Sequence, residues 1–493
     1  MSTLIVVNNP SDWELQIPGV ETVSARAYLT DPTYTDLRRA KVFNLCRSYG
    51  YQTLGYYVSL LAEARDHKPM PNVTTIQDMK SQGLVRFVSE DLDEQIQQSL
   101  TPVQTREFSL RVYFGRTSAK RHNSLARALF NLFQAPMLRA HFIHNNGKWQ
   151  LQTLRALPTS EIPPDQKTFL AEVASEYFEG RLPSTRKRVV WRYDLAILHD
   201  SSGKHVPSNE KSLLRFVKAA NALGMRADLI EKDDYGHLAE YDALFIRETT
   251  EVNHHTYRFS RRAKAEGMVV VDDPESIVKC TNKVYLAEVL SRNKLPTPKT
   301  LIVHKDNVDA VVQELGLPCI LKRPDSSFSQ GVIKVEDEKA LEVAAEQLHD
   351  KSDLFIAQSF LGTDFDWRVG VFDRRPLFVC RYFMAKNHWQ IVKRDGEGKS
   401  HFGKVETLPV GLAPANVVRT ALRAANLIGD GLYGVDLKQV GKKVYVIEVN
   451  DNPNIDHGYE DAVLKDELYL SIMRVFLERI EQRTEKRSPA SVW

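Results

Sequence analysis

The sequence predicts a multidomain protein that combines α/β and α+β architecture. Its 493 residues exceed the roughly 100 to 200 residues typical of one domain, and a hydrophobic fraction of 43% suffices for several cores. Between about 190 and 275, strand patterns alternate with helix patterns, which predicts a small parallel sheet. Beyond residue 276, the pattern predicts helices together with a β-hairpin, which is typical of an α+β domain. We therefore expect an N-terminal α/β region, a small parallel-sheet domain and a larger α+β domain.

Segments rich in proline and serine predict the boundaries between these regions. Ala156–Pro164 and Leu182–Arg188 have the composition of linkers, and the pattern changes after them. We expect an N-terminal extension domain at 1–185, the parallel-sheet domain at 190–275, the larger domain at 276–485 and a tail at 486–493.

The overall charge gives no reason to expect a polyanionic partner. Lys and Arg total 66 against 63 Asp and Glu, and a net charge of +3 creates no strong overall field.

The first residues lack the pattern of a secretory signal, and no run approaches about 18 apolar residues. The four cysteines are scattered, which predicts reduced thiols. We expect a cytoplasmic protein without a nucleic-acid or membrane partner.

The second region offers no clear cofactor-binding motif. No Gly-x-Gly-x-x-Gly follows its first predicted strand, 193–199, so an NAD-dependent dehydrogenase is disfavoured. His254 and His255 are adjacent, and the side chains of neighbours point apart on a helix or a strand. A metal shared by these two histidines is therefore not expected.

Lys283, at the start of a predicted helix, is the first candidate for phosphate binding. The segment Lys279–Lys283 is predicted to open a helix that runs to about Arg292. The positive end of the helix dipole favours phosphate at the same place. The alternative is a solvated surface lysine.

Lys322 strengthens the case for a phosphate site. It ends the apolar run Leu317–Leu321, which predicts a buried strand, and a buried ammonium needs an anion. The loop that follows is rich in small residues, which let backbone amides approach phosphate oxygens. Its candidate residues are Ser326, Ser327, Ser329 and Gly331. An ordinary flexible hairpin is the alternative for this loop.

Two carboxylates are predicted to converge on one patch of sheet. The segments Tyr433–Val440 and Val444–Asn450 read as a hairpin with a three-residue loop, which places Asp436 opposite Glu448. The strand period of two puts Asn450 on the same face. Facing carboxylates repel unless a cation neutralises them, and oxygen ligands suit Mg²⁺. The alternative is a solvent-facing acidic patch.

In chain order, these residues resemble the ATP-grasp superfamily, and most closely its RimK-like carboxylate-amine ligases. The matching motifs are Lys283, Lys322 with its loop, Gln358–Phe360, Asp366–Val369, Arg381, Asp436 and Glu448–Asn450. The resemblance covers about 190–485. It implies an ATP-grasp fold, with the nucleotide between two α+β subdomains and a pre-ATP-grasp domain at 190–275. Residues 1–185 look like the N-terminal extension that a subgroup of these proteins carries.

The resemblance also implies a role for each candidate residue. ATP would contact Lys283, Lys322, Ser326, Ser327, Ser329 and Gly331 through its phosphates, Gln358, Ser359 and Phe360 through adenine, and Asp366 through ribose. Arg368 and Arg381 would be catalytic, with Arg368 near the transferred phosphate. Asp436, Glu448 and Asn450 would hold one or two Mg²⁺ or Mn²⁺ ions.

Two segments depart from the RimK pattern. The loop after Lys322 has one glycine where RimK-like proteins usually have several, with serines in place of the others. The segment His388–Gln390 replaces the basic Arg-Ser-Asn segment of RimK, which bears on the substrate side.

The implied reaction phosphorylates a carboxylate with ATP and then lets an amine attack the acyl phosphate. Lysines, an arginine and Mg²⁺ suffice for this phosphoryl transfer. The partners would be small-molecule or peptide carboxylates and amines, with glutamate suggested by family analogy. A kinase or phosphotransferase, a peptide- or carrier-binding module fused to the ATP-grasp domain, and a nucleotide sensor stay open, as does a homo-oligomer.

Overall fold

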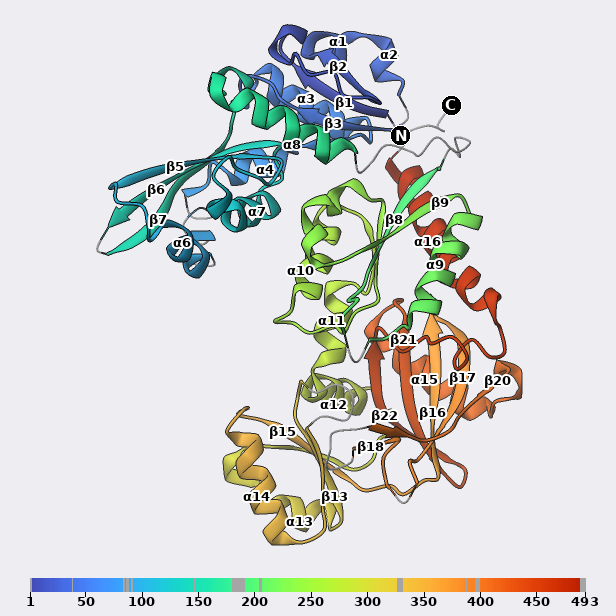
Figure 1. Cartoon of the computed structure of the whole chain (residues 1–493). Helices are drawn as coiled ribbons and strands as arrows, with labels where there is room; N and C mark the ends of the chain where they lie inside the picture. Colours follow the sequence, from blue (N-terminus) through green and yellow to red (C-terminus); the bar gives the residue numbers. More distant parts are fainter. Residues whose placement is uncertain are drawn as a thin grey trace. The chain divides into compact units, whose positions relative to one another are not determined.

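The structure is a computed structural model of the chain (Figure 1). It describes residues 2–37, 39–82, 85, 88–89, 92–145, 147–179, 191–203, 206–325, 331–386, 388–394 and 400–487. The chain forms two compact units. The first unit is Met1–Trp191 together with Tyr235–Glu240, and the second is Arg192–Asp234 together with Tyr241–Trp493.

The first unit contains a parallel sheet and an antiparallel sheet. The parallel sheet has the order β2-β1-β3-β4, formed by β1 (Ser2–Val7), β2 (Val20–Ser24), β3 (Ala40–Asn44) and β4 (Lys68–Met70). The antiparallel sheet is β5 (Glu107–Tyr113), β6 (Met137–Asn145) and β7 (Lys148–Ala156). The described helices are α1 (Ala25–Thr30), α2 (Pro32–Thr35), α3 (Leu54–Ala64), α4 (Val73–Asp78), α6 (Asp93–Leu100), α7 (Asn123–Leu132) and α8 (Lys167–Glu179).

Strand β1 shows why the first unit folds around two cores. Leu4 and Val6 belong to one core and Ile5 and Val7 to the other, and all four are fully buried. Because side chains alternate along a strand, a continuous apolar run is what a sheet covered on both faces requires. The predicted α/β character of the N-terminal region is confirmed.

The second unit begins with the predicted parallel sheet. Its order is β11-β10-β8-β9, formed by β8 (Tyr193–Leu198), β9 (Met225–Ile230), β10 (Ala243–Ile246) and β11 (Val269–Val271). The helices of this part are α9 (Glu210–Ala222), α10 (His255–Ala265) and α11 (Pro274–Thr281). The two central strands, β8 and β10, are short and almost entirely buried, which fits a sheet that helices cover.

A four-stranded antiparallel sheet follows. Its order is β12-β15-β13-β14, formed by β12 (Thr300–Val303), β13 (Cys319–Lys322), β14 (Val332–Val335) and β15 (Phe355–Ser359). The helices are α12 (Lys283–Arg292), α13 (Ala310–Leu315) and α14 (Glu338–His349). Apolar residues of α13 and α14, such as Val311 and Leu341, share a core with Leu321 and Phe355 of the strands.

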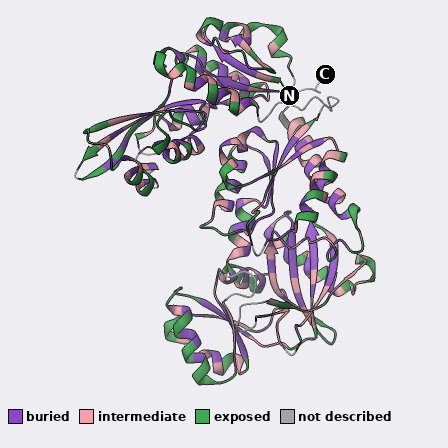
Figure 2. Ribbon diagram, in the orientation of Figure 1, coloured by how far each residue is buried: buried purple, intermediate pink, exposed green. Residues whose placement is uncertain are grey.

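A five-stranded antiparallel sheet completes the second unit. Its order is β20-β17-β16-β21-β22, formed by β16 (Phe365–Phe372), β17 (Arg375–Phe383), β20 (Val405–Leu408), β21 (Tyr433–Val440) and β22 (Lys443–Asp451). β18 (Val392–Arg394) pairs with β19 (Ser400–Phe402), and the helices are α15 (Ala415–Ile428) and α16 (Asp466–Arg487). In Figure 2, buried residues run along the strands of this sheet, and exposed residues are common on helices of the unit.

The two faces of the five-stranded sheet differ in chemistry. Trp367, Val369 and Leu437 point to one face and share a core with Val417 and Ala421 of α15. Arg368 pairs in register with Asp436, and Asp436 with Glu448, so these three side chains share the other face. This polar face carries the charged residues that the sequence singles out.

The β21–β22 hairpin differs from the prediction in its turn but not in its register at the carboxylates. Val440 pairs with Lys443, so the loop is the two residues Gly441 and Lys442 rather than three. The ladder then shifts between Asp436 and Leu437, where Leu437 pairs with Val446 and Asp436 with Glu448. The bulge offsets the shorter turn, and Asp436 faces Glu448 as predicted.

One predicted helix is two helices in the structure. Lys279 lies in α11, where its ammonium donates to the carbonyl of Ile428 at 2.9 Å. Asn282 separates the helices and caps α12 by accepting from the amides of Val284 and Tyr285. Lys283 is therefore the first residue of α12, because an asparagine side chain can satisfy the amides that a helix start leaves open.

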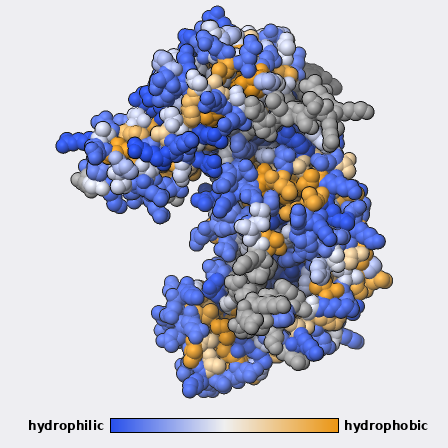
Figure 3. Space-filling model, viewed as in Figure 1, coloured by the Kyte–Doolittle hydropathy of each residue, from blue (hydrophilic) through white to orange (hydrophobic). Residues whose placement is uncertain are grey.

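No described helix combines the length and the apolar character needed to cross a bilayer. The face of the molecule seen in Figure 3 is largely hydrophilic, with apolar side chains in scattered groups. All four cysteines are buried and free, as predicted.

Candidate active site

An ion pair joins the start of α12 to strand β22. The ammonium of Lys283 lies 2.8 Å from Oε1 of Glu448, and the Lys283 side chain is buried. Burial alone would raise the pKa of Glu448, but the charges of Lys283, Lys322 and Arg368 outweigh it and hold the pKa below its ordinary value. Glu448 is therefore an anion held by several cations.

Lys322 places a second buried ammonium beside this pair. It ends strand β13, whose four residues are all buried, as predicted. Its pKa is lowered to about 8, chiefly by burial and also by the charge of Lys283, with Glu448 acting in the opposite direction. Within the described part of the chain, its ammonium has no hydrogen-bond or ion-pair partner at contact distance. An anion such as a phosphate would meet this need.

Asp436 is the acceptor of a bidentate arginine contact. Nε and Nη2 of Arg368 donate to its two carboxylate oxygens at 2.7 and 2.8 Å, and Nδ2 of Asn450 donates to Oδ2 at 3.1 Å. Asn450 therefore turns its amide nitrogen toward Asp436 and leaves its oxygen for another partner. The Arg368 guanidinium also lies 5.0 Å from the ring centre of Tyr382, which further fixes its position.

The oxygen atoms on this face fit a divalent cation. Asp436, Glu448 and Asn450 supply two carboxylates and an amide oxygen from adjacent strands, the donor set that Mg²⁺ prefers. Among the described residues, the recorded contact of Glu448 is through Oε1, which leaves Oε2 for a metal. The residues that are present thus fit the ion that the sequence implies.

A third lysine occupies the same face, and sequence reasoning missed it. Lys438 donates to Oδ1 of Asp366 at 2.5 Å and to Oγ1 of Thr363 at 2.8 Å. Burial raises the pKa of Asp366, and the Lys438 charge opposes that rise. Strand periodicity is sufficient to predict the position of Lys438, because it lies two residues after Asp436 and a period of two places both side chains on one face.

The segment predicted to face adenine lies at the end of β15. The amide of Ser359 donates to the carbonyl of Lys299 at 2.9 Å, and Nε2 of Gln358 donates to Oγ1 of Thr300 at 3.0 Å. Phe360 follows outside the sheet, with the Lys334 ammonium 4.7 Å from its ring centre. The ring of Trp389 lies edge-on to Phe360 with centroids 6.1 Å apart. Part of the His388–Gln390 segment therefore lies beside the residues predicted to contact adenine.

The structure does not bring Arg381 to the polar face. Arg381 pairs in register with Trp367, so it lies on the face that α15 covers, opposite to Arg368. Its guanidinium lies 5.4 Å from the ring centre of Phe365 and 5.3 Å from that of Trp367, with Glu406 at 3.9 Å. These contacts hold the Arg381 guanidinium beside two aromatic rings.

The loop after Lys322 is only partly described. Ser326, Ser327 and Ser329 lie outside the described residues. Gly331 adopts a φ of 70°, which favours glycine, and its carbonyl accepts from the amide of Arg323 at 3.0 Å.

A buried arginine links the end of β10 to the end of β22, and no local sequence pattern marks it. Nη1 of Arg247 donates to Oδ1 of Asn452 at 2.6 Å, and Nη2 donates to the carbonyls of Pro207 and Pro453. Oγ1 of Thr250 donates to Oδ2 of Asp451 at 2.7 Å. The chain that follows Asn450 is thus held by the loop that follows β10.

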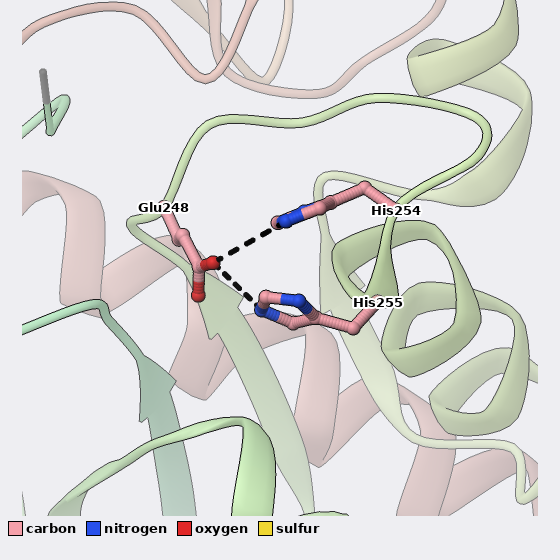
Figure 4. A group of neighbouring side chains, drawn as sticks. All are labelled: Glu248, His254 and His255. Carbon is pink, nitrogen blue, oxygen red and sulfur yellow. Dashed lines mark ion pairs between the residues drawn. The ribbon is translucent and has the colours of Figure 1, made fainter.

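The geometric expectation for the two histidines is wrong. The rings of His254 and His255 lie 3.9 Å apart between centroids, and both face the carboxylate of Glu248 (Figure 4). His254 is the extended N-cap of α10 and His255 is its first residue. The rule that neighbours point apart holds within one regular element, and the backbone changes between these two residues.

Two family models match this chain. Residues 25–173 match the model of the RimK-like ATPgrasp N-terminal domain, and residues 280–465 match the model of the RimK-like ATP-grasp domain. The chain belongs to the ATP-grasp ligases, and within them to the RimK-like family that carries this N-terminal domain.

Curated relatives and solved structures are similar to parts of this chain. A probable alpha-L-glutamate ligase of Vibrio vulnificus is 26% identical over 275 residues, covering 52% of this chain and 89% of the relative. A protein of the same description from Cellvibrio japonicus is 26% identical over 231 residues, covering 46% of this chain and 74% of the relative. A D-alanine--D-alanine ligase from Bacillus anthracis aligns with a TM-score of 0.46 at 15% identity, covering 60% of this chain and all of that one.

The protein is accordingly an ATP-using enzyme that forms a carbon–nitrogen bond between a carboxylate and an amine. The family, the fold class and the enzyme class predicted from the sequence are confirmed. These findings favour a ligase over the two alternatives of a nucleotide sensor and a kinase.

Proposed function

We propose that the protein adds an amino acid, with glutamate the first candidate, to the carboxylate of a peptide or small acid by way of an acyl phosphate. Glutamate is suggested by the description of the relatives as probable alpha-L-glutamate ligases. The substrate carboxylate would take the γ-phosphate of ATP, and the amine would then displace phosphate from the activated carbonyl. One carbon–nitrogen bond forms, and ADP and inorganic phosphate are released.

We assign the phosphates of ATP to Lys283 and Lys322. Lys322 carries the strongest structural argument, because its buried ammonium has no contact partner among the described residues and lies in the field of Glu448. Lysines at such positions neutralise charge on the transferred group, which is most of what phosphoryl transfer needs from a protein. Gln358, Ser359 and Phe360 are assigned to adenine, and Asp366 to ribose.

We assign a divalent cation to Asp436, Glu448 and Asn450. Mg²⁺ at these oxygens would neutralise phosphate charge and orient the β- and γ-phosphates. Arg368 stays bound to Asp436 through Nε and Nη2, which leaves Nη1 to contact the transferred phosphate. Gly331 and the serines before it would complete the phosphate contacts.

One observation on the polar face favours a carboxylate over an alcohol as the group that is phosphorylated. Of the carboxylates assigned to the metal, Glu448 is paired with Lys283 and Asp436 with Arg368. Asp366, whose pKa is raised by burial, is paired with Lys438 and is assigned to the ribose. A carboxylate that is paired with a cation is a poor base for an alcohol. A substrate carboxylate is already ionised at neutral pH and needs no base before it attacks phosphorus.

The test is the stoichiometry of the products with ATP, Mg²⁺ and a panel of amino acids and short acidic peptides. ADP and inorganic phosphate should appear in equal amounts only when a carboxylate and an amine are both present. Hydroxylamine in place of the amine should yield a hydroxamate. A stable phosphorylated product without any hydroxamate would contradict the proposal and favour a kinase.

A further inference from the structure

Glu248, His254 and His255 form a cluster outside the residues assigned to ATP and Mg²⁺. Nε2 of His255 lies 2.6 Å from Oε1 of Glu248, and Nε2 of His254 lies 4.0 Å from the same oxygen (Figure 4). The three ligand atoms all lie within 4.8 Å of one another. The cluster stands where the loop after β10 enters α10.

The contact between His255 and Glu248 lacks the direction of a hydrogen bond. Nε2 of His255 is buried and has no hydrogen-bond partner in the described structure, although Oε1 of Glu248 is only 2.6 Å away. The side chain of Glu248 is only 7% exposed. A buried nitrogen beside a buried carboxylate oxygen, without a bond between them, is the arrangement that a shared cation would resolve.

We propose that Glu248, His254 and His255 bind a divalent transition-metal ion of the Zn²⁺ class. Zn²⁺ binds imidazole nitrogen and carboxylate oxygen at about 2.0 to 2.2 Å, so two tetrahedral ligands lie about 3.3 Å apart. The two observed separations, 2.6 and 4.0 Å, lie on either side of that value. Mixed nitrogen and oxygen ligands favour such an ion over Mg²⁺, which prefers oxygen alone.

The surroundings hold two of the ligands in place. Nδ1 of His254 is hydrogen-bonded with Oγ1 of Thr256 at 3.1 Å, which leaves Nε2 to face Glu248. The backbone carbonyl of Glu248 accepts from Nδ2 of Asn452. Partners of this kind fix the orientation of metal ligands. Three protein ligands also leave a coordination position open, and the 38% exposure of the His254 side chain gives solvent access.

This site would lie next to the chain that carries the Mg²⁺ ligands. Asn452 holds Glu248, and it follows Asn450 by two residues. Arg247 and Thr250, on either side of Glu248, bind the segment Asp451–Pro453. The proposal does not depend on the substrate assigned above, because none of the three residues of the cluster is assigned to ATP, Mg²⁺ or the substrate.

The test is calorimetric titration of Zn²⁺ into the tag-free full-length chain, with excess Mg²⁺ present to occupy the oxygen-ligand site. The wild type should bind one equivalent. Glu248→Gln, His254→Gln and His255→Gln should each weaken binding at least tenfold. His304→Gln is the matched control, because His304 also lies beside a carboxylate, with Asp306 at 3.7 Å, but belongs to no cluster of three metal-binding side chains among the described residues. The control should bind as the wild type does.

Two further measurements separate binding from folding. Co²⁺ should give the visible absorption of a low-coordinate site in the wild type and lose it in His254→Gln. That variant removes a partly exposed side chain, and its circular dichroism should match the wild type. If the wild type takes up no Zn²⁺, or if Glu248→Gln and His254→Gln bind it as tightly as the wild type, the proposal is wrong.

Discussion

Lys283 contacts Glu448 at 2.8 Å and thereby ties the first turn of α12 to strand β22. Both side chains are largely removed from solvent, at 8% and 23% exposure. Asp436, directly opposite Glu448 in the hairpin, is tied in the same way to Arg368 of β16. Each carboxylate of the proposed metal site therefore has its own cation before any nucleotide or metal binds.

Removing either carboxylate charge should destabilise the ligand-free protein. Glu448→Gln takes a charged partner from the buried ammonium of Lys283, and Asp436→Asn weakens the bidentate contact with Arg368. Breaking such pairs costs about 3 kcal/mol. The free energy of unfolding from urea titration measures this loss.

A matched control distinguishes these pairs from surface pairs. Lys264 and Glu275 also form an ion pair, but their side chains are 51% and 55% exposed. Glu275→Gln should cost less than about 1 kcal/mol. Wild-type stability in both Glu448→Gln and Asp436→Asn would show that neither ion pair stabilises the fold.

Replacing Lys322 should weaken nucleotide binding without unfolding the protein. Lys322→Ala removes charge-assisted contacts worth about 1.5 to 3 kcal/mol, which corresponds to a tenfold or greater loss of affinity. Lys339→Ala, an exposed lysine on α14, is the control and should bind as the wild type does. Calorimetric titration of ATP analogue into each variant gives the comparison, and equal affinities would remove Lys322 from the site.

Nucleotide binding should take up protons near pH 8. The pKa of Lys322 is lowered to about 8 in the ligand-free protein, chiefly by burial, so about half of the molecules carry a neutral Lys322 at that pH. A bound triphosphate favours the charged form and raises the pKa, so affinity should fall as the pH rises above 8.

Calorimetry in two buffers of different ionisation enthalpy counts these protons. The wild type should take up about half a proton at pH 8, and this uptake should disappear in Lys322→Met and below about pH 6.5. The same uptake in Lys322→Met would assign the proton to a different group.

Asp366 should contribute to recognition of the ribose. Its carboxylate now binds Lys438 and Thr363, and Asp366→Asn would weaken any charge-assisted bond to a ribose hydroxyl by about 1.5 kcal/mol or more. The preference for ATP over 3′-deoxy-ATP should therefore narrow about tenfold. A preference equal to that of the wild type would leave Asp366 as a structural partner of Lys438 alone.

Strand periodicity explains why the polar face could be predicted. A period of two predicts Asp436, Glu448 and Asn450 on one face, and the bulge beside Leu437 offsets the error of one residue in the predicted turn. The same rule would have found Lys438. The pairing of each carboxylate with a separate cation was not predictable in this way, because Lys283 and Arg368 come from other elements.

The remaining differences arise where regular geometry ends. His254 and His255 converge because one is a cap and the other begins α10, and no periodic rule covers that step. Arg381 matched a motif position, but its register partner Trp367 puts it on the apolar face. Arg247 contacts residues more than 200 positions away in the chain, and such contacts appear only once the fold is known.

The proposed reaction requires that ATP activate a substrate carboxylate as an acyl phosphate. The most direct test uses the acidic peptide or amino acid that supports amine-dependent ADP release, labelled with ¹⁸O in its carboxylate. After turnover, mass spectrometry of the released phosphate should show one ¹⁸O atom transferred from each labelled carboxylate consumed. Amide formation with phosphate that carries no label from the carboxylate would rule out an acyl-phosphate intermediate.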